Sequence, residues 1–207
     1  PIYELPVTEQ APIKEAWSPY GHTKQISEKV IQNFSKTFPA NAILLRYFNP
    51  IGAHESALIG ELPLGVPDNL VPYITQTAIG KRDKLKVFGD NYNTADGTAI
   101  RDYIHVVDLA KAHVVAVDRM IKERNKQQVE IFNLGTGKGF SVLDVIKSFE
   151  KVSETKLNYE IVDRRPGDVE KVWADTKFAN DELGWKAEKT LDDMMRSAWN
   201  WELALQR

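Results

Sequence analysis

The sequence has no cysteine, which excludes disulfide bonds and thiolate metal sites. It has no paired histidine spacing of the His-Glu-x-x-His kind among its four histidines, so we expect no metal site. No apolar run approaches the roughly 20 residues that span a bilayer, and no secretory signal peptide can be recognised. These absences fit a cytoplasmic protein.

An excess of charge of one sign is also missing. The 27 Lys and Arg residues and 29 Asp and Glu residues give a net charge of −2 and are spread along the chain. No basic patch for nucleic acid is therefore expected. The 207 residues are 43% hydrophobic and 27% charged, which is typical of a globular chain with one sizeable core or two small lobes.

Glycine-rich nucleotide fingerprints are missing as well. Residues 135–139, GTGKG, lie between an expected strand and an expected helix, where a phosphate loop could stand. They fit neither the G-x-x-x-x-G-K-[ST] nor the G-x-G-x-x-G spacing. We therefore interpret them as a tight strand-to-helix turn, and no other segment offers a dinucleotide fingerprint.

Hydrophobic periodicity and capping residues predict alternating helices and strands. The expected helices cover 18–37, 69–80, 106–124, 141–152, 175–183 and 190–204, and the expected strands cover 42–48, 84–88, 98–104, 129–134 and 157–162. The alternation predicts an α/β architecture with a partly parallel sheet. The nearly continuous apolar run 42–48 is typical of a parallel strand covered on both faces, and 49–68 is expected to pass over a site.

Tyr20 and Lys24 lie four residues apart at the start of the expected helix 18–37, where Ser18 suits the N-cap and Pro19 the first helical position. This spacing places both side chains on one helix face. A nearby ammonium group and a helix N-terminus both stabilise a phenolate. A tyrosine so placed can act as an acid or base near neutral pH, which makes the chain a candidate redox enzyme.

Two arginine-bearing segments lie at strand ends, one with Arg101 and one with Arg165. Because arginine binds phosphate bidentately, the two segments could clamp a pyrophosphate; the alternative for each is surface ion pairing. Asn49 and Asn69 suit either a sugar or phosphate contact or a turn. Phe88 suits either stacking on a base or core packing.

Seven segments together carry a family resemblance. They are SPYGHTK at 18–24, LRYFNPIGAH at 45–54, NLVPYI at 69–74, FGDNY at 88–92, DGTAIRDYIHV at 96–106, FNLG at 132–135 and RRPGD at 164–168. In their order and spacing the chain resembles the UDP-glucose (UDP-galactose) 4-epimerases, which are extended short-chain dehydrogenases/reductases. The string at 96–106 is far more specific than the Tyr-x-x-x-Lys spacing, and it separates this branch from sugar dehydratases and most reductases of the superfamily.

The resemblance implies the end of a Rossmann-type doubly wound parallel sheet plus a smaller α/β substrate-binding lobe. Residues 1–50 are then the tail of the NAD-binding domain. Residues 51–207 form the nucleotide-sugar lobe, with roughly 105–135 packing back on the Rossmann sheet. The family's glycine-rich loop, acidic ribose ligand and catalytic Ser/Thr have no counterpart here, and the chain starts at Pro1 without an initiator Met. We expect a carboxy-terminal piece that is inactive by itself.

For catalysis, the resemblance implies NAD as cofactor and Tyr20 as the acid/base at the sugar 4-hydroxyl. Lys24 is expected to stabilise the ionised Tyr20 and to donate a hydrogen bond to the nicotinamide ribose. Tyr47 and Phe48 are expected along the nicotinamide. The implied reaction oxidises C4 of a UDP-hexose to a keto sugar, which turns and is reduced on its other face.

For the substrate, the resemblance places Asn49, Asn69 and Leu70 at the sugar and phosphates. Phe88 is expected beside the uracil.

The resemblance also implies contacts to the pyrophosphate and ribose of UDP. Arg101 and Arg165 are expected on the pyrophosphate, Tyr103 beside it and Asp168 on the uridine ribose. Val172 is expected beside the sugar 2-substituent, where a small residue admits an N-acetyl group. Valine is small to intermediate, which favours UDP-glucose and UDP-galactose with some activity on UDP-N-acetylhexosamines.

A homodimer is also expected from the resemblance, through helix 18–37. Two alternatives stay open. One is another nucleotide-sugar enzyme of the superfamily, such as a uronate epimerase or decarboxylase. The other is a UDP-sugar-binding module without catalysis.

Overall fold

The computed structural model describes residues 4–206 and has an α/β architecture. The α-helices are α1 (Pro19–Thr37), α2 (Leu70–Ala78), α3 (Val106–Ile121), α4 (Val142–Ser153) and α5 (Leu191–Ala204), with a π-helical turn, η1 (Ala179–Leu183). The strands are β1 (Ala42–Tyr47), β2 (Asn49–Ile51), β3 (Leu85–Phe88), β4 (Ile100–Arg101), β5 (Tyr103–His105), β6 (Val129–Leu134), β7 (Phe140–Ser141), β8 (Tyr159–Val162) and β9 (Lys171–Val172).

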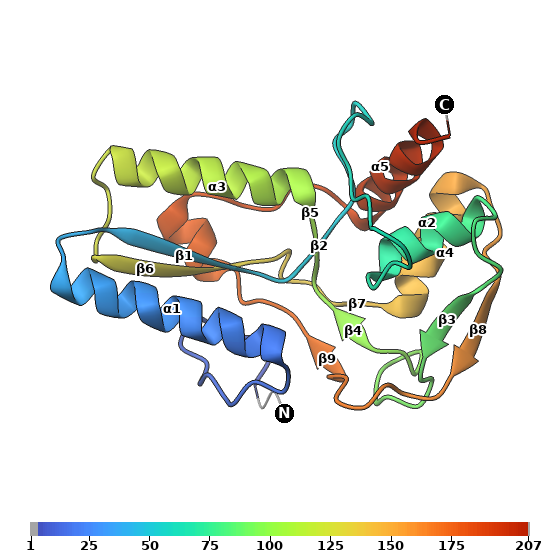
Figure 1. The fold of residues 1–207 in the computed structure, drawn as a ribbon, viewed down its shortest axis with the longest axis horizontal. Helices are drawn as coiled ribbons and strands as arrows, with labels where there is room; N and C mark the ends of the chain where they lie inside the picture. The colour runs from blue at the N-terminus through green and yellow to red at the C-terminus, as the bar shows by residue number, and fades with distance from the viewer. Residues whose placement is uncertain (1–3, 207) are drawn as a thin grey trace.

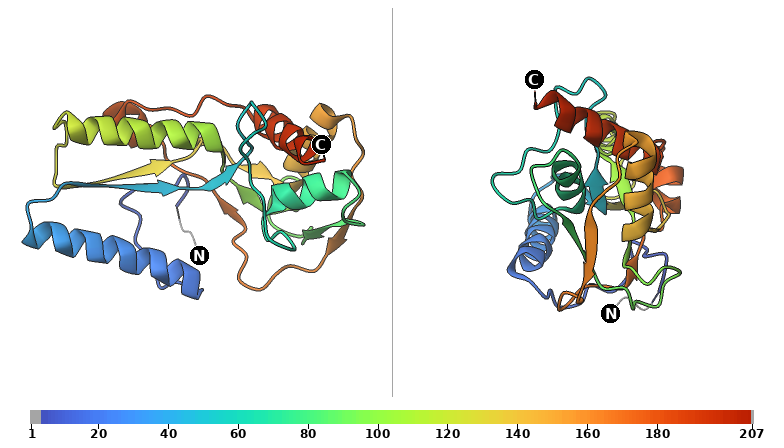
Figure 2. Two further views of the ribbon diagram at one scale, coloured as in Figure 1. Left: turned by 45° about the horizontal axis from the view of Figure 1, so that its top comes forward. Right: turned by 90° about the vertical axis from the view of Figure 1, so that its right-hand side faces the viewer.

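At one end of the molecule a pair of parallel strands lies between two helices. β1 and β6 pair with Leu44 opposite Ile131, and α1 and α3 lie on opposite sides of them (Figures 1 and 2). A cluster of buried side chains holds α3, β6 and η1 together, and Phe132, Leu134 and Ala112 in it are inaccessible to solvent. The predicted parallel strand at 42–48 is confirmed as β1, and this layer forms the back of a cavity that β1 lines.

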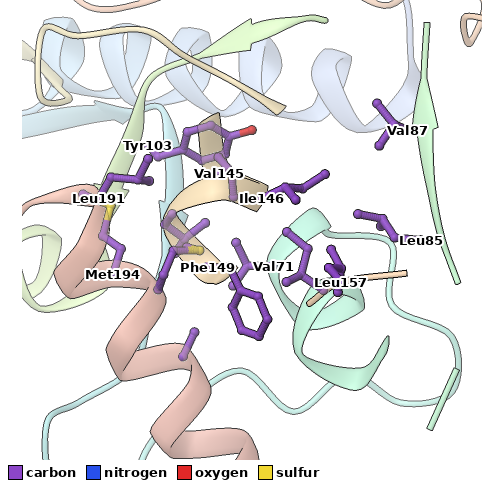
Figure 3. Close-up of a cluster of buried hydrophobic side chains, with 14 residues drawn as sticks. Val71, Leu85, Val87, Tyr103, Val145, Ile146, Phe149, Leu157, Leu191 and Met194 are labelled. Carbon is purple, nitrogen blue, oxygen red and sulfur yellow. The ribbon is translucent and has the colours of Figure 1, made fainter. Parts of the chain in front are cut away.

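The other end is built on a second hydrophobic cluster. Helices α2, α4 and α5 gather there beside β3 and β8 (Figure 1). In Figure 3, Phe149 and Val71 lie at its centre, with Leu85 and Val87 of β3 at its edge. Trp199 packs edge-on against Phe149 with 5.5 Å between ring centroids.

The predicted strand 98–104 is in fact two short strands with different partners. β4 pairs antiparallel with β7 and parallel with β9, whereas β5 pairs parallel with β2. The break falls at Asp102, whose buried carboxylate accepts hydrogen bonds from the backbone N–H groups of Thr136, Gly137 and Ala174. Because these donors come from distant segments, the switch between sheets has no local sequence signal.

Three expected helices are shorter than predicted. The segment 175–183 is helical only from 177 to 183, where it ends in the π-helical turn η1. Helix α2 covers Leu70–Ala78 instead of 69–80, and α3 ends at Ile121 instead of 124. The expected loop 49–68 contains the short strand β2. Among residues 4–206, no helix has both the length and the apolar character to cross a membrane.

Reciprocal hydrogen bonds fix the start of α5 and lead to a first prediction. Thr190 Oγ1 accepts from the Asp193 backbone N–H at 3.2 Å, and the Asp193 carboxylate accepts from the Thr190 backbone N–H at 2.9 Å. We expect Thr190→Ala to lower the free energy of unfolding by about 1 kcal/mol in urea titrations at pH 7.

The same cap should make stability depend on pH. The hydrogen bonds from Thr190 hold the pKa of Asp193 below its usual range. A lowered folded-state pKa stabilises the protein above the unfolded-state pKa, and this contribution disappears as the pH falls through the folded-state value. The loss of unfolding free energy caused by Thr190→Ala should therefore be smaller in acid than at pH 7. An equal loss in acid and at pH 7 would contradict this origin.

Candidate active site

A cavity of about 1250 Å³ brings together residues from both ends of the molecule. Its walls come from α1, β1, β2, the start of α2, β3 and the strands β4 and β5. Twelve of the thirteen predicted site residues line it: Tyr20, Lys24, Tyr47, Phe48, Asn49, Asn69, Leu70, Phe88, Arg101, Tyr103, Arg165 and Asp168. Val172 does not belong to the lining, although it lies directly opposite Arg101 in the β4–β9 register.

The Tyr20–Lys24 pair lies in the first turns of α1. Ser18 is the N-cap, and its hydroxyl accepts a hydrogen bond from the Gly21 N–H at 3.1 Å. Lys24 Nζ lies 5.0 Å from the centroid of the Tyr20 ring. Because Tyr20 is 69% exposed, its phenol is open to a molecule in the cavity. The predicted N-cap and the shared helix face are confirmed.

Arg46 fastens the helix that carries this pair. Its guanidinium donates to both carboxylate oxygens of Glu28, at 2.8 and 2.6 Å, and to the carbonyl oxygen of Glu9 at 3.1 Å. The hydrogen bond to Glu28 raises the pKa of Arg46 above its ordinary value, against the opposing effect of burial. Since Glu28 lies one turn beyond Lys24, this ion pair holds the Tyr20–Lys24 face of α1 against β1.

Opposite charges meet on the other side of the cavity. Asp168 accepts a hydrogen bond from Arg165 Nε at 3.0 Å and lies 3.7 Å from Arg101 Nη2. The Arg165 guanidinium also lies 4.7 Å from the centroid of the Phe88 ring. Two guanidinium groups, one carboxylate and one aromatic ring thus converge, which is suitable for a phosphate, a sugar hydroxyl and a flat base.

Tyr103 supplies a permanently protonated donor near this cluster. Only 5% of the residue is exposed, and burial raises the pKa of its phenol to about 12, against the opposing effect of Arg101. The phenol therefore stays neutral at physiological pH.

The two predicted asparagines differ in their surroundings. Asn49 begins β2 and is exposed toward the cavity. Asn69 occupies the N-cap position of α2, but its side chain makes no cap bond and instead donates to Glu61 Oε1 at 2.6 Å. A ligand could replace that contact.

Amides of the glycine-rich turn at 135–139 are occupied by other parts of the protein. The N–H groups of Thr136 and Gly137 donate to Asp102 at 2.8 and 3.1 Å. A Cβ on Gly135 would lie 2.3 Å from Asp102 Oδ2, which explains why glycine stands there. The segment is a turn after a strand, as interpreted, but it leads into the two-residue strand β7, which runs directly into α4.

Sequence reasoning missed several lining residues, among them Glu28, Arg46, Tyr73, Lys86 and His113. A signal existed for Arg46, which is a charged residue inside an otherwise apolar strand. The others stand in ordinary polar or amphipathic patterns, so their positions at the cavity became visible only with the fold.

The chain matches one protein-family model and is similar to individual curated proteins. The family model described as GDP-mannose 4,6 dehydratase matches residues 2–198. The UDP-glucose 4-epimerase of Pasteurella multocida is 49% identical over 199 residues, and that of Drosophila melanogaster is 50% identical over 201 residues. Each match covers 96% of this chain, and the chain spans 58% and 57% of the two proteins.

Solved structures show the same likeness. The crystal structure of UDP-glucose 4-epimerase from Bifidobacterium longum, in complex with NAD+ and UDP, is 48% identical with a TM-score of 0.91, covering 98% of this chain and 59% of that one. An enzyme of the same name from Stenotrophomonas maltophila, with bound NAD and formylated UDP-arabinopyranose, is 46% identical with a TM-score of 0.94, covering 99% and 60%. The likeness supports the Rossmann-type α/β fold expected from the sequence.

Proposed function

The chain belongs to the family described as GDP-mannose 4,6 dehydratase, and from this premise we propose that it forms the carboxy-terminal part of an NAD-dependent UDP-glucose 4-epimerase. One observation carries the proposal. The Tyr20–Lys24 pair and the cluster of Arg101, Arg165 and Asp168 line the same cavity of about 1250 Å³. An acid/base pair thus faces a site for a nucleoside diphosphate.

The nicotinamide end of the cofactor fits one side of this cavity. Tyr20 and Tyr47 are exposed there with their hydroxyl groups, and Lys24 adds an ammonium group. Together with the ring of Phe48, these groups suit a ribose and a flat pyridine ring. The Thr136 and Gly137 amides are occupied by Asp102, and we propose that the cofactor's phosphates are bound outside residues 4–206.

We propose that Tyr20 transfers the proton of the sugar 4-hydroxyl. Bound NAD+ would accept the hydride from C4 of the sugar and return it. The Tyr20 phenolate takes the proton of the 4-hydroxyl as C4 becomes a carbonyl, and it gives a proton back when C4 is reduced from the other face. Lys24 stabilises the phenolate through its positive charge. The keto sugar turns about its phosphate link between the two steps.

The charged cluster is proposed to hold UDP during this turn. Arg101 and Arg165 bind the pyrophosphate, with the Tyr103 phenol as a further donor. Asp168 then accepts from the uridine ribose, and Phe88 stacks beside the uracil. Strong contacts at the nucleotide end allow the sugar to be held weakly.

Three residues are proposed nearer the sugar. Asn49 and Asn69 offer amide groups, and Leu70 offers an apolar surface.

Residues 1–50 are proposed as the tail of the cofactor domain and 51–207 as the substrate lobe. The full-length protein is proposed to be a homodimeric cytoplasmic enzyme of galactose metabolism.

The test is conversion by the full-length protein. With NAD+ present, UDP-galactose should be converted to UDP-glucose, followed by NMR of the anomeric protons. GDP-mannose and UDP-glucuronate are the matched controls, because their conversion would indicate other nucleotide-sugar enzymes of the superfamily. Binding of UDP without conversion of any of the three would instead favour a binding module.

Val172 leads to a prediction about specificity. We expect measurable turnover of UDP-N-acetylglucosamine, and we expect Val172→Tyr to lower kcat/KM for that substrate at least about tenfold while activity on UDP-glucose persists, since pocket size discriminates by about this much. Val169→Tyr is the control, because Val169 lies three residues earlier, outside β9, and is not paired with Arg101. No detectable N-acetyl turnover in the unsubstituted protein would contradict the assignment of Val172.

A further inference from the structure

The segment 163–170 connects β8 to β9 and carries two adjacent arginines. Both ends of the segment are fastened to the stretch 89–100. The Gly89 N–H donates to the Val162 carbonyl at 2.8 Å, and the Ile100 N–H donates to the Glu170 carbonyl at 2.9 Å. The Glu170 carboxylate also accepts from the Asn93 N–H at 3.0 Å. Between these anchors, the Asp168 N–H donates to the Arg165 carbonyl at 3.3 Å, and the Arg164 side chain makes the hydrogen bonds to the stretch 89–92.

The two arginines have different surroundings. Arg165 lines the cavity, pairs with Asp168 and lies over the Phe88 ring. Arg164 is not among the lining residues. Its guanidinium lies 3.8 Å from the centroid of the Tyr92 ring, and it donates to the side-chain oxygen and the backbone carbonyl of Asn91. Only one of the pair is thus placed to touch a ligand.

The residues around Arg164 form a surface that matches its side chain in shape. The Tyr92 ring is 5% exposed, so it is a fixed surface for the guanidinium. Gly89 leaves the necessary space, because a Cβ there would lie 2.6 Å from Arg164 Cγ and 2.8 Å from the Tyr92 ring. Stacking combined with two hydrogen bonds needs the planar fork of arginine, which lysine lacks.

We propose that Arg164 is a positioning residue: it fixes the segment 163–170 on the stretch 89–92, so that Arg165 and Asp168 face a bound nucleoside diphosphate. This inference rests on the proposed function. A preorganised segment loses little conformational freedom on binding, whereas a loosened one must be ordered by the ligand at the expense of affinity. Arg164 acts through Arg165 and Asp168 and takes no part in proton transfer at Tyr20.

The test is a double-mutant cycle in the full-length protein with UDP as the probe. Arg164→Ala and Arg164→Lys should each raise the dissociation constant of UDP, by about tenfold for alanine. KM for UDP-galactose should rise while kcat stays unchanged. In an Arg165→Ala background, adding Arg164→Ala should have much less effect, since coupled residues are not additive. Arg124→Ala, an exposed arginine outside the cavity lining, is the control.

Three results would overturn the inference while the proposed function stands. One is an unchanged UDP affinity in Arg164→Ala. Another is a double variant in which the two increases in the UDP dissociation constant multiply in full. That would mean that Arg164 contacts the ligand itself or acts only on stability. The third is a fall in kcat at unchanged KM. If the unsubstituted protein binds no UDP, the proposed function fails together with the inference.

Discussion

Replacing Tyr20 by phenylalanine in the full-length protein is expected to lower kcat for the proposed conversion of UDP-galactose by a factor of about 10²–10⁴, the usual contribution of a positioned acid or base. The ring and its neighbour Lys24, 5.0 Å from the ring centroid, remain in the variant, while the proton-carrying oxygen is lost. Affinity for UDP should be unchanged, because the proposed UDP contacts lie at Arg101 and Arg165 on other elements.

Steady-state kinetics and calorimetric titration with UDP separate these two effects. Tyr159→Phe is the matched control, because Tyr159 is a partly exposed tyrosine on β8 outside the cavity lining. Full kcat in the Tyr20→Phe variant would remove the acid/base role from Tyr20. A loss of UDP affinity equal to the loss of kcat would show that the substitution disturbs the whole cavity.

The parts of this site that could be predicted are those with local signals. The Ser18 cap, the start of α1 and the spacing of Tyr20 and Lys24 follow from residues within one helical turn or two. The parallel strand β1 follows from an uninterrupted apolar run. Grouping of the twelve lining residues was implied by the family resemblance, since no periodicity relates Tyr20 to Arg165.

The parts that could not be predicted depend on contacts between distant segments. Arg46 binds Glu28 and Glu9, so the brace of α1 joins three separate stretches of chain. The chain leaves β4 and enters β5 at Asp102, whose hydrogen-bond partners lie at 136, 137 and 174. Likewise, Arg164 and Arg165 are neighbours in sequence but separate in role. Side-chain hydrogen bonding across the fold decides each case.

A buried ion pair between segments distant in sequence also holds together the layer behind the cavity. Arg119 at the end of α3 donates to both carboxylate oxygens of Glu130 on β6, at 2.7 Å each, and to the carbonyl oxygen of Glu182 in η1 at 2.8 Å. Glu130 also accepts from the Lys126 N–H at 3.0 Å. These bonds tie α3 and η1 to β6, the strand that pairs with the cavity-lining β1.

We therefore expect Arg119→Met to lower the free energy of unfolding by about 3–5 kcal/mol, because it leaves the Glu130 carboxylate buried without its cation. Hydrogen bonds from Arg119 hold the pKa of Glu130 below its ordinary value against the opposing effect of burial, and the substitution removes that support. Wild-type stability should then fall as the pH drops through the lowered pKa, and the variant should lose this dependence.

Urea unfolding at several pH values measures both effects. Arg124→Met is the control, because its ion pair with Asp118 is exposed and such pairs contribute about 0–1 kcal/mol. The double variant Arg119→Met with Glu130→Leu should recover much of the loss, since replacing both partners by apolar groups leaves no unpaired charge. Equal losses in the Arg119 and Arg124 variants would mean that the buried pair does not hold β6 in place, and that packing around Phe132 alone supports the back of the site.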